Sequence, residues 1–415
     1  MTGSGEFLRG TYDAARFGIY RAIAAFRYKG LGAVSPADFF ASRSVMVLRP
    51  DGIGDMIMTL PALFLLRRLI PNARIDILVR PSAAEVARHA AIFDNIYEFE
   101  PRDAPVKTRA PGQHTFYPLM VQLRRNRYDL VIDIAGRSRT RKLGFSIGGR
   151  RLVSPSHYLY ENPGNNLHFL ASDLIAMPEP PRHSVDNFIH VIHTLAGRED
   201  SWLYEWPLSS HDEQAARERL HDLGVHGDFV VIHPFSSDEL KDWPRERFVE
   251  VGSAILDRYD VSLVLSGSAR EADLLREMAA AVSQPERCVV AAGALTIVDI
   301  AAACRMAKLL VTVDTSVMHA GDIAGAKVVA LMLPHNTIAG PYSQPQHVIL
   351  PACPGETFTQ YRTPDDEREV RRIDRIPVAD VLERVISALD SAPSGVSHSP
   401  APDGDTSSLR PSAER

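Results

Sequence analysis

Three short segments of the sequence combine glycines, hydroxyls and charged side chains that could act on an anionic ligand. In the first, Gly52 and Gly54 follow an apolar run and allow a tight turn and a close backbone approach. Asp55 then falls in the first turn of an expected helix, where a carboxylate could take a proton from an attacking hydroxyl. Alternatively, Asp55 only caps that helix, because free amides and the helix dipole favour carboxylates there. The spacing leaves both interpretations open.

The second segment joins an apolar run at residues 229–233 to the next expected helix. Ser236 and Ser237 offer hydroxyls and amides to a phosphate, and Lys241 offers a compact positive charge. A single lysine in a polar loop is more often simply solvated, so this segment is a weak signal when taken alone.

In the third segment, residues 309–320, a buried apolar run ends at Asp314. Thr315 and Ser316 begin a helix there, and the free amides of a helix start can bind a pyrophosphate. His319 lies about one turn into this helix. It either reaches a phosphate or ribose or is an ordinary packing histidine.

The surrounding pattern predicts the elements that must position these segments. Short β-branched runs alternate with helical patterns from Ser44 onward, and the alternation restarts at Phe229. Such alternation is typical of parallel sheets with helices on both faces. We therefore expect an α/β fold with two doubly wound, Rossmann-like domains. Ligands of such sheets bind at the carboxyl ends of the strands, so all three segments should face one central crevice.

The predicted organisation has six parts. We expect a helical extension over 1–43, a first domain over 44–200, a connection over 201–228, a second domain over 229–350, a closing helical region over 351–390 and a disordered tail over 391–415. Within the first domain, residues 165–197 read as two mostly helical stretches, and residues 101–114 read as a loop. The tail is rich in Ser and Pro with almost no large apolar residue, which is typical of disorder.

Composition excludes several classes of protein. The chain has 415 residues, 45% of them hydrophobic, and a net charge of −5, which argues against a protein that mainly binds nucleic acid. Neither GxGxxG nor a Walker A loop is present, so an NAD enzyme is disfavoured. No histidine cluster has metal-ligand spacing, and Asp403 and Asp405 lie in the expected tail, so we expect no metal ion. The three cysteines are far apart and read as reduced thiols of a cytosolic protein.

The N-terminal region has an amphipathic pattern but no signal peptide and no apolar run long enough to span a membrane. Its aromatic and aliphatic residues follow helical spacing among several arginines: Phe7, Tyr12, Phe17, Tyr20, Ile23 and Phe26. Such a helix either lies on an anionic membrane surface or packs on the main body. The sequence is compatible with both.

Taken in this order, the three segments resemble those of glycosyltransferase family 9, whose best-known members are lipopolysaccharide core heptosyltransferases. The resemblance covers roughly residues 44–350. It implies a GT-B fold, in which the first domain binds the acceptor and the second the nucleotide sugar. It also implies inverting, metal-independent transfer of a sugar, heptose from ADP-heptose above all, to a lipopolysaccharide core or a related cell-surface glycan.

The resemblance also assigns roles to individual residues. It implies that Asp55 is the general base and that Lys241 contacts donor phosphate. The nucleotide would lie near a set of residues in the second domain: Ser236, Ser237, Glu271, Asp314, Thr315, Ser316 and His319. Glu271 is similar to an acidic residue that holds the ribose hydroxyls. The expected partners are a nucleotide-sugar donor and a glycolipid or glycan acceptor, with no cofactor, at the cytoplasmic side of the inner membrane.

The chain departs from the family pattern at two loops. In the first loop, Phe235 stands where the family usually has Gly. In the second loop, Met332 and Leu333 replace the family's Phe-Gly, and His335 to Thr337 replace the family's Thr-Asp-Pro. Two other functions stay open: a nucleotide-sugar epimerase or hydrolase on the same scaffold, and a non-catalytic nucleotide-sugar-binding protein.

Overall fold

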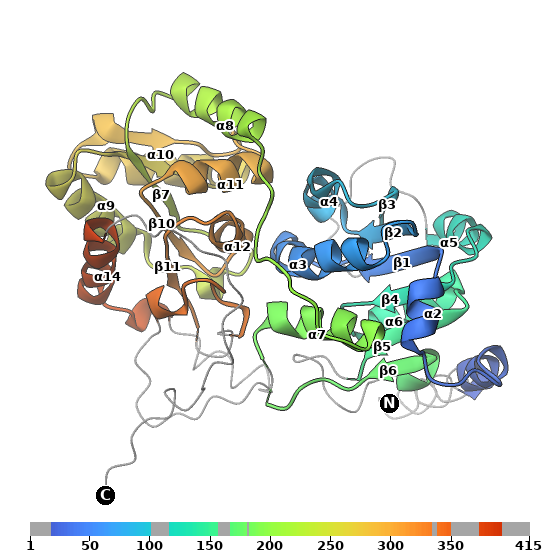
Figure 1. Ribbon diagram of the computed structural model, residues 1–415. Helices are drawn as coiled ribbons and strands as arrows, with labels where there is room; N and C mark the ends of the chain where they lie inside the picture. Colours follow the sequence, from blue (N-terminus) through green and yellow to red (C-terminus); the bar gives the residue numbers. More distant parts are fainter. Residues whose placement is uncertain are drawn as a thin grey trace, which may run out of the picture.

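The computed structural model describes residues 18–100, 116–156, 167–180, 182–333, 338–349 and 373–391. They form two parallel six-stranded sheets that lie side by side (Figure 1). The first sheet has the order β3-β2-β1-β4-β5-β6 and the second the order β12-β11-β10-β7-β8-β9. The strands are β1 Ser44–Arg49, β2 Arg74–Val79, β3 Asn95–Glu98, β4 Leu130–Asp133, β5 Arg151–Pro155, β6 Asp173–Ile175, β7 Phe229–His233, β8 Ser262–Leu265, β9 Cys288–Val290, β10 Leu309–Val313, β11 Val328–Leu331 and β12 Val348–Ile349.

Both sheets therefore have the same order of parallel strands: the first three strands are added towards one edge, and the next three are added on the other side of the first strand. The switch lies between β1 and β4 in one sheet and between β7 and β10 in the other. Loops after these strands diverge to opposite faces and leave an opening at the carboxyl ends, which is where doubly wound sheets bind ligands. The expected α/β architecture is confirmed, and each predicted segment follows β1, β7 or β10.

Helices cover both faces of each sheet because successive residues of a buried strand point to opposite sides. The α-helices are α2 Pro36–Ala41, α3 Ile53–Leu69, α4 Ala84–Ala90, α5 Phe116–Arg125, α6 Ser138–Ile147, α7 Ser184–Ala196, α8 Ser210–Asp222, α9 Arg245–Arg258, α10 Ala272–Ala281, α11 Ile297–Met306, α12 Ser316–Ile323 and α14 Val378–Asp390. In β1, Val45 and Val47 join the core beneath α3 and α7, whereas Met46 and Leu48 join the core beneath α5 and α6.

Buried polar contacts join the two halves and the chain between them. The Tyr204 hydroxyl, in the connection, donates to Asp322 of α12 at 2.6 Å. The indole of Trp206 donates to His89 of α4 at 2.7 Å, and the other ring nitrogen of His89 lies 3.1 Å from Asp212 of α8. Helix α12 also packs directly against α3. The halves are thus held by specific contacts as well as by the chain itself.

One sequence-based expectation about the first half is wrong. Residues 165–197 are not two helical stretches, because Asp173–Ile175 forms β6, paired with β5, and only α7 is a long helix. Strand β6 is short and begins at a polar residue, so it lacks a continuous apolar run. The loop expected over 101–114, Cys353, residues 334–337 and the tail from 392 onward lie outside the described residues.

The described part of the N-terminal extension contains a helix over residues 18–27. Ala24 is buried, and the rings of Tyr20 and Tyr28 pack edge-on against Phe145 of α6. The guanidinium of Arg27 lies over the Phe145 ring and donates to the Phe145 carbonyl at 2.7 Å. One side of the helix is therefore packed on the main body. Phe7, Tyr12 and Phe17 lie outside the described residues.

Candidate functional site

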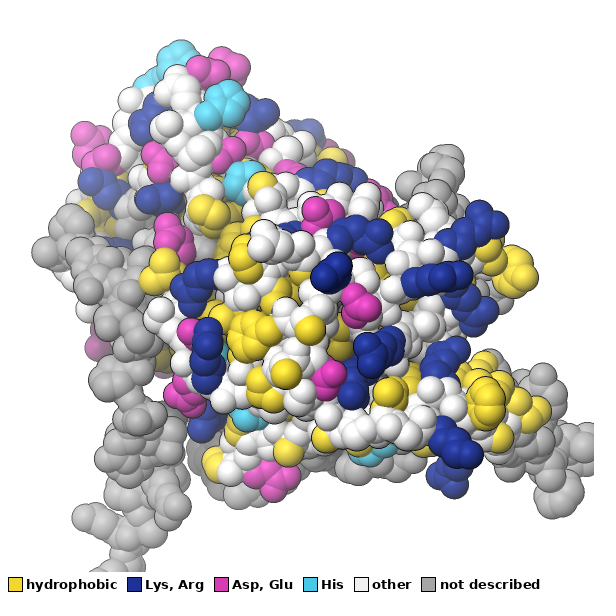
Figure 2. Space-filling model, turned by 45° about the vertical axis from the view of Figure 1, so that its right-hand side comes forward, with side chains coloured by type: hydrophobic (Ala, Val, Ile, Leu, Met, Phe, Trp, Pro, Cys, Tyr) yellow, Lys and Arg dark blue, Asp and Glu magenta, His cyan; other side chains and the backbone are white. Residues whose placement is uncertain are grey.

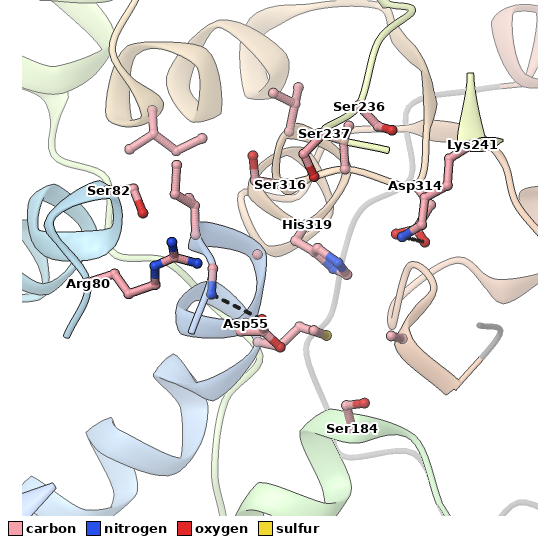
Figure 3. A pocket seen from close by; sticks show the side chains of 18 of the residues that line it. Asp55, Arg80, Ser82, Ser184, Ser236, Ser237, Lys241, Asp314, Ser316 and His319 are labelled. Carbon is pink, nitrogen blue, oxygen red and sulfur yellow. Dashed lines mark hydrogen bonds and ion pairs between the residues drawn. The ribbon is translucent and has the colours of Figure 1, made fainter. Parts of the chain in front are cut away.

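A cleft of about 840 Å³ lies where the carboxyl ends of the two sheets face each other. Side chains from both halves line it (Figure 3). Each predicted site residue is part of this lining: Gly52, Gly54, Asp55, Ser236, Ser237, Lys241, Glu271, Asp314, Thr315, Ser316 and His319. Residues up to 267 positions apart in the chain, from Gly52 to His319, thus share one cavity.

Asp55 both caps α3 and faces the cleft, so the two interpretations of this residue are compatible. One carboxylate oxygen accepts from the Gly52 amide at 3.2 Å, and the other lies 3.3 Å from the guanidinium of Arg49. The side chain keeps 30% of its surface exposed. A fixed carboxylate with an accessible face can receive a proton from a ligand bound in the cleft.

Arg49, at the end of β1, is fully buried and holds this turn together. Its guanidinium pairs with Asp51 at 3.1 Å and also donates to the backbone carbonyl of Asp55 at 3.1 Å. The group lies over the ring of Phe188 at 4.6 Å. A planar, multidentate cation suits this position better than an ammonium would.

Lys241 and Asp314 form an ion pair on the opposite side of the cleft. The Lys241 ammonium donates to Asp314 at 2.7 Å, with the lysine side chain 26% exposed and the aspartate 7% exposed. Lys241 is therefore not a freely solvated lysine. The pair brings a positive charge from the loop after β7 next to the end of β10, where Thr315 and Ser316 begin α12.

The start of α12 presents backbone amides to the cleft. Thr315 is the residue that precedes the first helical turn, and its side chain makes no capping hydrogen bond. Amides of this kind, together with the helix dipole, form a ready anion site. Ser316 lies at the first helical position and lines the same cavity (Figure 3).

His319 is buried at the bottom of the cleft against the first segment. Its Nδ1 has no hydrogen-bond partner among the described residues. Burial lowers the pKa of His319, although the carboxylates of Asp314 and Asp55 act in the opposite direction. The direction of this shift favours the neutral imidazole.

The remaining predicted residues in the second half are partly engaged in local turns. The Ser236 amide donates to Asp242 at 2.7 Å, and its hydroxyl donates to the Asp238 carbonyl at 2.8 Å. Ser237 is exposed. The Glu271 carboxylate accepts from the amide of Ser268 at 2.6 Å and so caps the start of the short 3-10 helix Ala269–Glu271. Glu271 also lines the cleft.

The sequence reasoning missed several lining residues. Arg80 directly follows β2 and Arg137 lies shortly after β4, and both line the first half of the cleft. Each is paired with a carboxylate, Arg80 with Glu100 at 2.5 Å and Arg137 with Asp51 at 3.7 Å. The rule that ligands bind at the carboxyl ends of strands would have found both. His233 ends β7 and Ser266 directly follows β8, so the same rule applies to them. The His233 ring and the Ser266 hydroxyl are hydrogen-bonded at 2.9 Å. Burial lowers the pKa of His233 to about 4.

Apolar side chains also line the second half of the cleft, at the start of α11. Leu295, Ile297 and Ile300 form this wall together with Ala291. A flat apolar base stacks well on such a surface, since ligand pockets combine apolar walls with a few polar groups. Among the described residues, no group of three or more His, Cys, Asp or Glu side chains could hold a metal ion.

Two doubly wound halves that face one cleft are the GT-B architecture. A family model described as "Glycosyltransferase family 9 (heptosyltransferase)" matches residues 117–360. The chain belongs to this family.

Individual relatives agree with this assignment. The chain is 23% identical to lipopolysaccharide heptosyltransferase 3 of Escherichia coli over 349 residues, which are 83% of this chain and 98% of the relative. A solved family 9 glycosyltransferase from Veillonella parvula DSM 2008 superposes with a TM-score of 0.69 at 22% identity, covering 84% of this chain and 97% of that one. The E. coli ADP-heptose LPS heptosyltransferase II gives 0.62 at 17% identity, covering 83% and 98%.

Proposed function

We propose that this protein transfers heptose from ADP-heptose to a hydroxyl of a lipopolysaccharide core or a related surface glycan, with inversion at the anomeric carbon. One observation carries the proposal. A fixed, accessible carboxylate, Asp55, lines one side of a cleft whose other side combines the Lys241 ammonium with the amides at the start of α12. A base opposite an anion site is what a single displacement on a nucleotide sugar requires.

In this mechanism Asp55 is the general base. The acceptor hydroxyl oxygen attacks the anomeric carbon while its proton passes to the Asp55 carboxylate. The bond between the anomeric carbon and the diphosphate oxygen breaks at the same time, and its electron pair leaves with the diphosphate. Because one displacement occurs on the face opposite the leaving group, the anomeric configuration inverts.

Lys241 and the α12 amides stabilise the departing ADP. Negative charge grows on the diphosphate as the glycosidic bond breaks, and preorganised donors in a shielded cleft offset that charge. Lys241 exchanges part of its pairing with Asp314 for the donor phosphate, while Ser237 and Thr315–Ser316 supply further donors. We propose that these groups act without a metal ion.

The nucleoside occupies the second half of the cleft. The wall at Leu295 and Ile297 suits a flat base, Glu271 suits the ribose hydroxyls, and His319 lines the same cleft. The name of the E. coli heptosyltransferase II relative supports ADP-heptose as the donor. Residues 229–350 would then form the donor domain and residues 44–200 the acceptor domain.

The acceptor side carries positive charge. Arg80 and Arg137 both line the cleft in the first half, where Arg80 is paired with Glu100 at 2.5 Å and Arg137 with Asp51 at 3.7 Å. We propose that they turn part of this pairing towards the carboxylates or phosphates of an anionic glycolipid core. The relative named lipopolysaccharide heptosyltransferase 3 supports this class of acceptor. We place the reaction at the cytoplasmic face of the inner membrane. Among the described residues, no helix combines the length and apolarity needed to cross a bilayer.

Asp55→Asn tests the proposal because it keeps the shape of the side chain and removes the base. We expect the rate of heptose transfer to fall at least about 100-fold, whereas the Kd for ADP stays within about twofold of wild type. Transfer in excess EDTA should equal transfer in added Mg²⁺. Undiminished transfer by a folded Asp55→Asn variant would refute the base assignment, and nucleotide release without any acceptor would indicate a hydrolase instead.

A further inference from the structure

The first half of the molecule has a surface on which cationic and large apolar side chains are exposed together. It is formed by helical residues 18–27, by α5, and by α6 with the turn that follows it. We refer to residues 18–35, 116–127 and 138–150 as the basic–apolar face. Dark-blue and yellow side chains gather at the right of Figure 2, the side that Figure 1 assigns to these elements.

The charge of this face is opposite to that of the whole chain. Its three segments contain ten Lys and Arg and no Asp or Glu, although the chain has a net charge of −5. Eight of the ten are exposed: Arg21, Lys29, Arg124, Arg125, Arg127, Arg139, Lys142 and Arg150. Two carboxylates border the face. Asp129 accepts from the amides of Arg43 and Ser44, and Asp38 accepts from the amide and hydroxyl of Ser35 and lies near Arg150. The face therefore has a strong local positive field.

Large apolar side chains project from the same face. Ile19, Ile23 and Phe26 are 63%, 44% and 83% exposed, and their spacing of four and three residues puts them on one side of the helix. Tyr117, in α5, is 77% exposed. The opposite side of the helix is already packed on Phe145, so the exposed stripe is not the surface that attaches the helix to the main body.

The three segments meet at Gly148, the residue that ends α6. A Cβ at this glycine would lie 3.8 Å from Arg27 and 3.8 Å from Arg124. Arg124 also donates to the Ser146 carbonyl at 2.6 Å, so α5, α6 and the N-terminal helix are fixed relative to one another. The exposed cations and apolar side chains consequently belong to one rigid surface.

We propose that the basic–apolar face binds the surface of an anionic lipid bilayer. Cations near a negatively charged leaflet gain electrostatic free energy, and neighbouring apolar side chains enter the boundary between headgroups and acyl chains. A nucleic acid would match the charge but would leave Ile19, Ile23 and Phe26 in water. The combination of an acid-free cationic field and a projecting apolar stripe favours the bilayer.

This surface is connected to the cleft by α6. Arg137, immediately before the helix, lines the cleft, and Phe145, in its last turns, accepts from Arg27 of the face through its carbonyl. A helix of ten residues is about 15 Å long, so a bilayer on this face lies within reach of a glycan that extends into the cleft. The inference itself does not depend on the proposed reaction, because lipid binding is measured without any substrate.

The test measures partition of the full chain onto vesicles by co-sedimentation. Phosphatidylcholine vesicles containing phosphatidylglycerol should bind the protein, and vesicles of phosphatidylcholine alone should not. Binding should weaken as NaCl rises from about 0.1 M to 0.5 M, because the charges are screened. The triple variant Lys29→Glu/Arg125→Glu/Arg150→Glu should lower the partition coefficient at least about 100-fold. Ile19→Gln/Phe26→Gln should lower it roughly tenfold.

Matched variants on the second half serve as controls. Leu203→Gln/Leu274→Gln removes two exposed apolar side chains, and Arg217→Glu/Arg270→Glu/Arg276→Glu reverses three exposed charges; none of these residues lines the cleft. Both controls should bind vesicles like wild type, with unchanged ADP affinity in all variants. The proposal fails if neither vesicle binds the chain or if the controls lose binding equally. It also fails if light scattering shows that the wild-type protein is a dimer and that the Ile19→Gln/Phe26→Gln variant is a monomer that still binds vesicles like wild type.

Discussion

The imidazole of His319 lies against the backbone of Gly54, so closely that a Cβ at position 54 would be 2.8 Å from its Cδ2 atom. The contact joins the start of α3 in the first half to α12 in the second. Glycine is therefore needed at position 54 for approach rather than for a special backbone angle. This contact couples the segment that holds Asp55 to the segment that would hold the donor.

Gly54→Ala should consequently disturb both segments. The added methyl must displace the His319 ring, and overpacking of this kind costs about 1–3 kcal/mol. We expect a lower thermal midpoint and a fall of at least about tenfold in kcat/KM, measured by calorimetry and by steady-state transfer. Gly52→Ala is the matched control, because its Cβ would meet only Asp55 at an ordinary 3.5 Å. Equal effects of the two substitutions would contradict the role given to the contact.

Arg49→Lys should destabilise the turn that holds Asp55. An ammonium cannot reproduce the contacts to Asp51 and to the Asp55 backbone at once, so Asp51 is left buried with incomplete pairing. We expect the free energy of unfolding in urea to fall by about 2–3 kcal/mol. Arg88→Lys, at an exposed pair with Glu98, should cost less than about 1 kcal/mol. A stable Arg49→Lys protein would show that the turn does not depend on the guanidinium.

Lys241→Ala should weaken donor binding specifically. The variant loses the proposed charge-assisted contact to the donor diphosphate. It also leaves Asp314, whose negative charge repels the diphosphate, without its lysine partner. We expect the Kd for ADP to rise about 10- to 100-fold by calorimetry, with the KM for acceptor changed less than about threefold. Lys308→Ala removes a lysine paired with Asp228 outside the cleft and should leave both constants unchanged. If ADP affinity survived in Lys241→Ala, the amides of α12 alone would bind the diphosphate.

His233 predicts a pH dependence of stability. Burial lowers its pKa from 6.5 to about 4, so the unfolded chain binds a proton at this residue before the folded chain does. The stabilising contribution is complete above pH 6.5 and is lost as the pH falls towards 4, by about 3 kcal/mol in total. His233→Gln, which can still bond to Ser266, should flatten the fall in unfolding free energy over this range. His211→Gln, on the exposed side of α8, should not.

Much of the architecture could be predicted because it depends on local pattern. The runs at β1, β7 and β10 are continuous and apolar, so the strands, and the segments that follow them, could be recognised from the sequence. Strand β6 could not, since its three residues include a half-buried Asp173 and an exposed Leu174. Its place is fixed by pairing with β5, a tertiary contact that periodicity does not encode.

The same distinction applies to the site. The glycines before Asp55 indicated that this residue would fall in a first helical turn. Its contact with Arg49, by contrast, depends on how β1 and α3 pack. The proximity of Gly54 and His319 arises only when two separately folded sheets meet. Arg80 was missed although it directly follows β2, because its neighbours Val79 and Pro81 carry no glycine or hydroxyl signal.

The bond between Tyr204 and Asp322 limits how the two halves could be exchanged with those of relatives. Asp322 is almost completely buried, and burial raises the pKa of its carboxyl while the Tyr204 hydroxyl is one of the donors that hold it. A chimera that takes its chain up to residue 209 from a relative and the rest from this protein would carry the relative's residue in place of Tyr204. A junction placed before residue 201 would keep the donor with its acceptor. Because Trp206 of the connection also donates to His89 of the first half, such an exchange keeps the Tyr204–Asp322 bond but requires a relative that carries a matching acceptor at position 89.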